Sequence, residues 1–263
     1  METVLEVTDL HMDFGGVKAL NGLTMDVKKE EILGIIGPNG AGKTTFFNCV
    51  TGIYEPTQGD IFIKPHGTGK RVRINNLKPN TITKHGIART FQNIRLFQNL
   101  TVLENVMIGR HSKGSSGIAG AVLRLPSQKK EEKEIIQKSR LILEKLELGK
   151  YADEFAKNLP YGAQRRLEIA RAMATEPFLL LLDEPAAGMN PHETKDLDDL
   201  IKRIRDTEKI SILLIEHDMR LVMSISDRII VLDYGEKIAE GTPLEIKNNH
   251  AVIEAYLGED AYA

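Results

Sequence analysis

The fold is decided by a stretch of the chain that reads Gly37-Pro38-Asn39-Gly40-Ala41-Gly42-Lys43-Thr44-Thr45. It matches the pattern G-x-x-x-x-G-K-[ST] at every fixed position. The short apolar run 32–36 precedes it and predicts a buried strand, and residues 43–51 follow it as an expected helix. A strand, a glycine-rich turn and a helix in this order form the setting in which the pattern holds the phosphates of a nucleotide.

The chemistry of this phosphate loop follows from its residue types. Glycines allow backbone N–H groups to point inward at phosphate oxygens, and the start of the following helix adds the positive end of its dipole. Lys43 supplies a point charge for the β- and γ-phosphates, and the Thr44 hydroxyl suits a Mg²⁺ ion. The alternative is a glycine-rich turn that happens to precede a lysine. The motif alone indicates only a nucleoside triphosphate, because kinases, GTPases, helicases and transport ATPases share it.

Two adjacent carboxylates, Asp183 and Glu184, follow the apolar run 178–182. Ligands of open α/β sheets bind at the carboxyl edge of the strands, where this pair is expected to lie. Successive strand residues point in opposite directions, so the two side chains should have separate tasks. Asp183 is suited to hold Mg²⁺, and Glu184 is suited to orient and polarise an attacking water. The alternative is a solvated acidic pair at the start of a loop.

The remaining pattern predicts an α/β fold. Short apolar runs alternate with amphipathic helices in the second half of the chain, which favours a mostly parallel sheet with helices on both faces. The expected strands are 32–36, 178–182, 210–215 and 229–232, and the expected helices are 164–174 and 192–207. N-terminal strands at 4–7, 23–27 and 61–63 are expected to form an antiparallel part. We expect a core of residues 1–92 and 161–263 with a helical subdomain inserted at 93–160, which includes a charged helix at 128–148.

Composition narrows the function classes. The 263 residues carry a formal net charge of −2, which argues against a strongly basic nucleic-acid binder. Cys49 is the single cysteine, so no internal disulfide can form, as is usual in a reducing compartment. The longest aliphatic run, 178–182, is far below the roughly 20 residues of a membrane span. The N-terminal residues have no secretory-signal pattern, so any membrane association is expected to come through a partner.

Five elements in fixed order resemble the motifs of the ATP-binding-cassette (ABC) ATPases over essentially the whole chain. They are the phosphate loop, Gln92, the segment Leu159-Pro160-Tyr161-Gly162-Ala163-Gln164, the acidic pair and His217. The resemblance implies that the protein binds and hydrolyses ATP with Mg²⁺. It further implies that Gln92 reaches the Mg²⁺ and the attacking water, and that His217 contacts the γ-phosphate. For His217, a purely structural role after the strand 210–215 is the alternative.

The same resemblance assigns an adenine site. Phe14 stands where family members place an aromatic ring that stacks on adenine, and Val17 lies beside it. A ring buried in the core is the alternative for Phe14. Beyond Gln92, the residues Phe91, Phe97 and Leu100 would supply apolar contact to a membrane partner, or would be buried within the insert.

The resemblance also implies a dimer, in which each ATP lies between the phosphate loop of one subunit and residues 161–164 of the other. The segment departs from the usual Leu-Ser-Gly-Gly-Gln, because Pro160 stands where a γ-phosphate-binding serine is expected, while Gly162 and Gln164 remain. Backbone N–H groups at 162–164 and the helix start can still attract an anion. We therefore expect weaker or slower closure of the dimer rather than loss of function.

Within the family, residues 161–171, 184–191 and 215–219 are similar to the ATP-binding subunits of branched-chain amino-acid importers, as is the Gly/Ser-rich connection at 111–127. This similarity implies a second ATPase subunit, identical or paralogous, and a transmembrane permease as partners. It also implies a periplasmic or extracellular solute-binding protein as an indirect partner, no nucleic acid, and a cytoplasmic position on the inner face of the membrane. Lipopolysaccharide-export and urea-import ATPases share much of the pattern. A soluble ABC ATPase and a phosphate-loop kinase are more distant alternatives.

Overall fold

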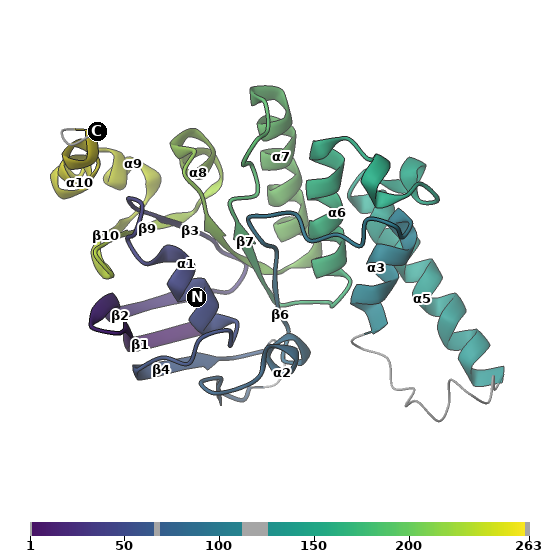
Figure 1. Ribbon diagram of the computed structural model, residues 1–263, viewed down its shortest axis with the longest axis horizontal. Coiled ribbons are helices and arrows are strands. Elements are labelled where there is room, and N and C mark those ends of the chain that lie inside the picture. Colours follow the sequence, from purple (N-terminus) through teal and green to yellow (C-terminus); the bar gives the residue numbers. More distant parts are fainter. Residues whose placement is uncertain (1, 66–68, 112–125, 261–263) are drawn as a thin grey trace. The chain divides into compact units, whose positions relative to one another are not determined.

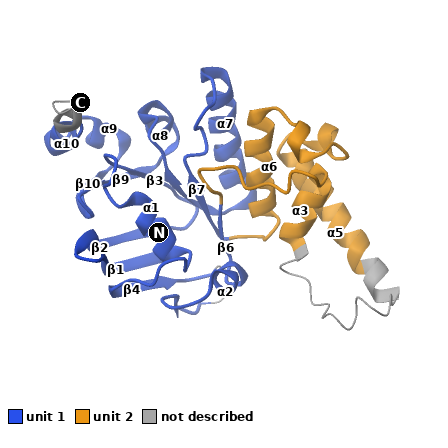
Figure 2. Cartoon of the chain, viewed as in Figure 1, with its two compact units in different colours: residues 1–89, 178–263 blue, residues 90–177 orange. Residues whose placement is uncertain are grey.

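The computed structural model describes residues 2–65, 69–111 and 126–260. The chain forms two compact units, which Figure 2 shows in different colours. The first contains residues 1–89 and 178–263, and the second contains residues 90–177. Most of the expected connection at 111–127 lies outside the described residues.

A six-stranded, mostly parallel sheet is the centre of the first unit. Its strand order is β10-β9-β3-β8-β7-β6, and only β10 pairs antiparallel with its neighbour. The strands are β3 (Ile32–Ile36), β6 (Ile87–Arg89), β7 (Leu179–Asp183), β8 (Ser211–Ile215), β9 (Arg228–Asp233) and β10 (Glu236–Gly241). Every residue of β3, β7 and β8 is buried, as expected for strands covered on both faces. The predicted parallel strands are thus confirmed, whereas the short β6 and the hairpin strand β10 escaped prediction.

A second, antiparallel sheet of order β2-β1-β4-β5 belongs to the same unit. Its strands are β1 (Thr3–Phe14), β2 (Val17–Lys28), β4 (Gln58–Ile63) and β5 (Val72–Arg73). One apolar core joins side chains of both sheets with Phe46 and Phe47 of helix α1 (Lys43–Val50). Figure 1 shows α1 on one face of the parallel sheet, with α7 (Pro191–Glu208) and α8 (Met219–Ile225) on the other. The shorter helices of this unit are α2 (Pro79–Lys84), α9 (Pro243–Lys247) and α10 (His250–Asp260).

The second unit is helical. It contains α3 (Val102–His111), α5 (Pro126–Lys145) and α6 (Tyr161–Met173), with short 3-10 turns at Gly149–Tyr151 and Ala156–Asn158. Helix α3 packs against both α5 and α6. Because α6 packs on these helices, the compact unit extends beyond the expected subdomain 93–160. Among the described residues, no helix has both the length and the apolar character needed to cross a bilayer.

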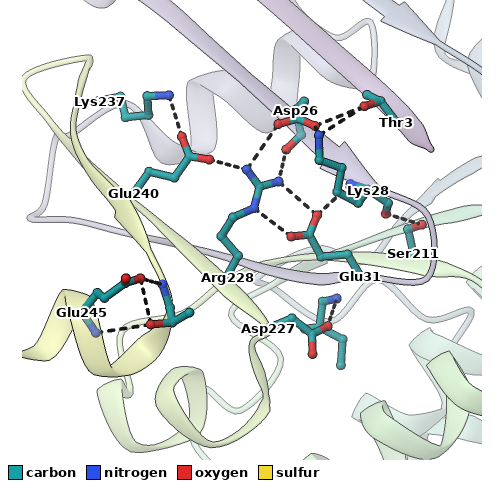
Figure 3. Close-up of polar contacts among 12 residues, drawn as sticks. Thr3, Asp26, Lys28, Glu31, Ser211, Asp227, Arg228, Lys237, Glu240 and Glu245 are labelled. Atoms are coloured by element: carbon teal, nitrogen blue, oxygen red, sulfur yellow. Dashed lines mark hydrogen bonds and ion pairs between the residues drawn. The ribbon is translucent and has the colours of Figure 1, made fainter. Parts of the chain in front are cut away.

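One partly buried arginine ties the two sheets of the first unit together (Figure 3). Arg228 of β9 makes a two-pronged ion pair with Glu31, at 2.8 and 3.0 Å. The same guanidinium bonds the backbone oxygen and the carboxylate of Asp26 in β2, at 2.7 and 3.2 Å, and also contacts Glu240 of β10. Burial acts to raise the pKa values of Asp26 and Glu240, but Arg228 and neighbouring lysines outweigh it and lower both.

We expect Arg228→Met to remove about 2–3 kcal/mol from the free energy of unfolding at neutral pH. It leaves the buried carboxylate of Glu31 and the partly buried carboxylates of Asp26 and Glu240 without their cation, and this partial exposure keeps the cost below that of a fully buried pair. Lys209→Met is the matched control, since Lys209 is exposed and lies 3.7 Å from Glu30, a pair worth less than about 1 kcal/mol. The lowered pKa values mean that the cluster stabilises the protein above the ordinary carboxyl values of 3.8 and 4.5 and loses this effect as the pH falls below them. Urea unfolding at several pH values measures both effects. The account would be contradicted if Arg228→Met lowered the free energy of unfolding by less than about 1 kcal/mol at pH 7, or if the loss were the same in acid as at pH 7.

Candidate nucleotide site

The phosphate loop connects β3 to α1, as predicted. Gly42 caps the helix in a left-handed conformation with a φ of 96°. The Lys43 side chain is buried, and its Nζ donates to the backbone oxygens of Gly37 at 2.5 Å and Pro38 at 2.8 Å. The lysine head group is thus held over the loop by the loop's own carbonyls. Thr44 is exposed at the start of the helix, and Thr45 is half-buried.

Two glycines of the loop are required by close backbone approaches. A Cβ on Gly37 would lie 2.0 Å from the oxygen of Leu232, and a Cβ on Gly42 would lie 2.4 Å from the oxygen of Ala19. Any larger residue would therefore displace the loop from β9 or from β2. By contrast, Gly40 has open space around the position of a Cβ, and both Asn39 and Gly40 are exposed, while Ala41 is buried.

The turn between β9 and β10 supports the phosphate loop from outside. The N–H of Gly235 donates to the oxygen of Ala41 at 3.2 Å, and its carbonyl accepts from the N–H of Asn21 at 2.9 Å. Tyr234 and Gly235 both have positive φ values, 44° and 80°, as a tight hairpin turn requires. The sequence analysis did not identify this support. A Tyr-Gly pair after an expected strand was the available signal.

Asp183 ends β7 in a buried position and is held by an arginine from the next strand. Its Oδ2 accepts from Arg89 of β6 at 2.7 Å, and both side chains are less than one-tenth exposed. Arg89 also donates to the Oδ1 of Asn48 in α1 at 2.7 Å. A buried carboxylate keeps its charge only when it is paired in this way. Sequence reasoning missed Arg89, whose signal was a charged residue in an otherwise apolar strand next to β7.

Glu184 and His217 are brought into direct contact. The Nε2 of His217 lies 2.7 Å from the Oε1 of Glu184, and the Glu184 side chain is 12% exposed while that of His217 is 46% exposed. Glu184 has a φ of 47°, and its N–H donates to the oxygen of Ile215, the last residue of β8. A non-glycine residue in this conformation is uncommon and often marks a functional position. The two residues named from separate motifs therefore form one pair at adjacent strand ends.

Glu216 is a third acidic residue of this site, and the sequence analysis overlooked it. It is 3% exposed, and its Oε1 accepts from the N–H of Ala186 at 2.7 Å while its Oε2 accepts from the N–H of His217 at 3.1 Å. Burial raises the pKa of Glu216, the backbone donors oppose the rise, and the nearby Glu184 adds to it. Its carboxylate thus ties the loop after β7 to the end of β8. Its position directly after an apolar strand, like that of Asp183, was the signal.

The expected adenine ring is on the surface. Phe14 is 42% exposed and Val17 is 67% exposed, and the two residues pair across the β1–β2 turn. The ring of Phe14 packs edge-on against Tyr54, with 5.2 Å between the ring centres. The alternative of a buried core ring is therefore wrong for Phe14.

Gln92 and the segment 161–164 lie in the second unit. The Gln92 side chain is exposed, while its backbone oxygen accepts from Arg165 at 2.5 Å. Phe97 is 48% exposed, and Phe91 and Leu100 are partly buried, so the apolar side chains of this segment are divided between the surface and the interior.

Pro160 caps α6 without a side-chain hydrogen bond. The N–H groups of Ala163 and Gln164 both donate to the Pro160 oxygen at 3.0 Å, so they serve the first turn of the helix. Three backbone N–H groups, those of residues 162–164, were expected to attract an anion. Two of them are used within the helix, and the Gly162 N–H near the helix start remains as the candidate donor. Tyr161 is 41% exposed.

The donor set suits a Mg²⁺ ion that is shared with a nucleotide. No group of three or more His, Cys, Asp or Glu side chains is arranged to hold a metal within the described part of the chain. Mg²⁺ is commonly bound through one or two protein oxygens together with substrate phosphates, and the Thr44 hydroxyl and the Asp183 carboxylate are oxygens of this kind.

Comparisons of the sequence with known proteins give the family of the chain. The family model described as ABC transporter matches residues 20–187, and the model described as branched-chain amino acid ATP-binding cassette transporter matches residues 236–262. The chain is 47% identical to the high-affinity branched-chain amino acid transport ATP-binding protein LivG of Escherichia coli, over 98% of this chain and 99% of LivG. It is 46% identical to the corresponding protein BraF of Pseudomonas aeruginosa, over 97% and 98% of the two chains.

Solved structures with a similar fold are also ATP-binding cassettes. An ATP-binding cassette of an ABC transporter in its ADP conformation superposes with a TM-score of 0.84 at 31% identity, covering 98% of this chain and all of the other. A dimeric cassette in a post-hydrolysis state, bound to ADP and phosphate, has a TM-score of 0.73 at 25% identity and covers 91% and 98% of the two chains. With its phosphate loop, acidic strand end and histidine in place, the chain belongs to the ATP-binding-cassette transporter ATPase family.

Proposed function

We propose that this protein is the ATP-hydrolysing subunit of an importer for branched-chain amino acids. The observation that carries the proposal is the contact between Glu184 and His217 at the ends of β7 and β8, beside the strand β3 that leads into the phosphate loop. A carboxylate that can accept a proton, at the same sheet edge as a loop that can hold a triphosphate, supports ATP hydrolysis as the reaction.

In the proposed reaction, ATP is the substrate and its phosphates are held by the N–H groups of 37–45 and by Lys43. Bound Mg²⁺, held by Thr44, Asp183 and Gln92, would supply positive charge to the phosphate oxygens. Glu184 accepts a hydrogen bond from the water that attacks the γ-phosphorus, while the bond from that phosphorus to the β-phosphate oxygen breaks. His217 fixes the orientation of Glu184 through their 2.7 Å contact and would also contact the γ-phosphate of bound ATP. Phe14 and Val17 receive the adenine from the surface turn between β1 and β2.

The proposed active form is a dimer. Each ATP lies between the phosphate loop of one subunit and residues 161–164 of the other, so a lone subunit leaves the γ-phosphate half-covered. Loss of the γ-phosphate removes contacts across the interface and releases the subunits. The dimeric cassette with ADP and phosphate among the similar structures supports this mechanism.

The names of the relatives support the solute class that we propose. LivG and BraF carry branched-chain amino acid transport in their names, and the chain aligns with almost their whole lengths. The match of residues 236–262 to a branched-chain model supports the same solute class. We place the protein at the inner face of the membrane, bound to a transmembrane permease and served by a solute-binding protein.

Uptake by reconstituted vesicles tests the transport proposal. We expect the protein, assembled with the permease subunits and the solute-binding protein of a branched-chain amino-acid importer, to drive ATP-dependent entry of radiolabelled leucine. Lys43→Ala in the same assembly is the control, since it removes the lysine that contacts the phosphates. Uptake of urea without leucine, or no uptake in an assembly that hydrolyses ATP, would refute the proposed solute class.

Glu184→Gln tests the catalytic carboxylate. The amide retains the size of the side chain but is a poor proton acceptor, so we expect ATP binding to persist while kcat falls by about 100-fold or more. The variant should then accumulate as an ATP-bound dimer, which light scattering detects. Turnover close to that of the parent would remove Glu184 from the mechanism.

Pro160→Ser tests the unusual segment before α6. A serine at the N-cap accepts a hydrogen bond from the first turn, worth about 1 kcal/mol, and it offers a hydroxyl to the nucleotide. In the Glu184→Gln background, we expect the ATP-bound dimer of Pro160→Ser to be at least as tight as that of the parent, with Pro160→Ala as the control. A weaker dimer would show that the proline is adapted to this interface.

A further inference from the structure

A buried ion pair lies on α6 directly after the segment 161–164. Arg165 and Glu168 are 4% and 3% exposed, and the Nη1 of Arg165 lies 3.4 Å from the Oε2 of Glu168. Burying two opposite charges is expensive, and replacing such a pair with apolar residues often leaves a protein equally stable. Stability alone therefore does not explain why α6 carries charges at these two buried positions.

Both members of the pair use their hydrogen bonds to hold the main chain around Gln92. Arg165 donates to the backbone oxygen of Phe91 at 3.0 Å and to that of Gln92 at 2.5 Å. Glu168 accepts from the backbone N–H of Arg95 at 2.7 Å. The segment 91–95 is thus bound at both ends by two side chains one helical turn apart.

The same arginine reaches the segment that precedes it. Its Nη2 lies 3.0 Å from the hydroxyl oxygen of Tyr161 and 2.5 Å from the oxygen of Gln92. A single guanidinium group therefore connects a side chain of 161–164 with the backbone of Gln92. Arginine suits this task because its planar group presents several donors in a fixed geometry, which lysine does not.

We propose that Arg165 and Glu168 are positioning residues that couple nucleotide contact at 161–164 to the placement of Gln92. When 161–164 closes on the nucleotide held by the other subunit, Arg165 moves with the start of α6 and carries the backbone of Gln92 with it. Hydrolysis of the ATP held by one subunit thereby depends on the contact that this subunit's residues 161–164 make with the ATP held by its partner. The inference rests on the proposed function, because it assumes the roles of Gln92 and of 161–164 given there.

Hydrogen exchange and steady-state kinetics test this coupling. We expect Arg165→Gln to speed amide exchange across 91–95 by about tenfold, because charge-assisted hydrogen bonds to the segment are lost. The same variant should lower kcat by about tenfold and leave KM for ATP within about twofold, since the phosphate loop is untouched. Arg166→Gln is the matched control, because Arg166 is the next residue of α6 and pairs at 3.1 Å with Glu147 at the surface. The control should change neither readout.

Two further variants separate coupling from a structural role. Glu168→Gln keeps an acceptor for the Arg95 N–H but removes the charge, and Arg165→Lys keeps a charge with fewer donors, so both should fold and show intermediate losses of kcat. In a double-mutant cycle with Gln92→Ala, the losses should be strongly non-additive, since Arg165 acts through Gln92. Additive losses, or faster exchange at 91–95 with an unchanged kcat, would overturn the inference.

The outcome is separable from failure of the proposed function. If Glu184→Gln hydrolyses ATP normally, the proposed mechanism fails, whatever the Arg165 variants do. If Glu184→Gln traps an ATP-bound dimer while Arg165→Gln, Arg165→Lys and Glu168→Gln all turn over at the parental rate, the coupling alone is wrong.

Discussion

The arrangement of the adjacent parallel strands β3, β8 and β7 determines the geometry of the site in the first unit. Every proposed catalytic residue of that unit lies at or directly after the carboxyl end of one of these strands. The phosphate loop leaves β3, Glu216 and His217 leave β8, and Asp183 and Glu184 close β7. The register of the strands brings these residues to the same level along the sheet, because Ile215 of β8 pairs with both Asp183 of β7 and Ile35 of β3. A shift of one strand by one residue would turn its apolar side chains to the opposite face and separate Glu184 from His217.

Three buried or partly buried arginines hold charged groups where the apolar framework alone would exclude them. Arg89 holds Asp183, Arg228 joins the two sheets, and Arg165 fixes the segment around Gln92. In each case the arginine has an acidic partner and at least one further acceptor, which offsets the cost of removing its charge from water. These three arginines therefore position other groups, and apolar packing supplies most of the stability.

The sequence predicted what local pattern and motif spacing determine. The strands β3, β7, β8 and β9 are short apolar runs, and the phosphate loop has fixed spacing, so both were predictable from the chain alone. The contact of Glu184 with His217 and the roles of Arg89, Glu216 and Gly235 were not, because these groups meet only after distant segments are brought together. The use of the Ala163 and Gln164 amides by Pro160 likewise depends on where the first turn of α6 closes.

The central claim is that each nucleotide is completed by two subunits, and mixing two inactive variants tests it most directly. One variant carries Lys43→Ala and the other carries Gly162→Asp, which places a carboxylate where the triphosphate of the other subunit would bind. A mixed dimer has one site with an intact phosphate loop and an intact 161–164 segment, so the account predicts that hydrolysis returns on mixing. A mixture as inactive as either variant alone, under conditions in which the two subunits associate, would contradict it.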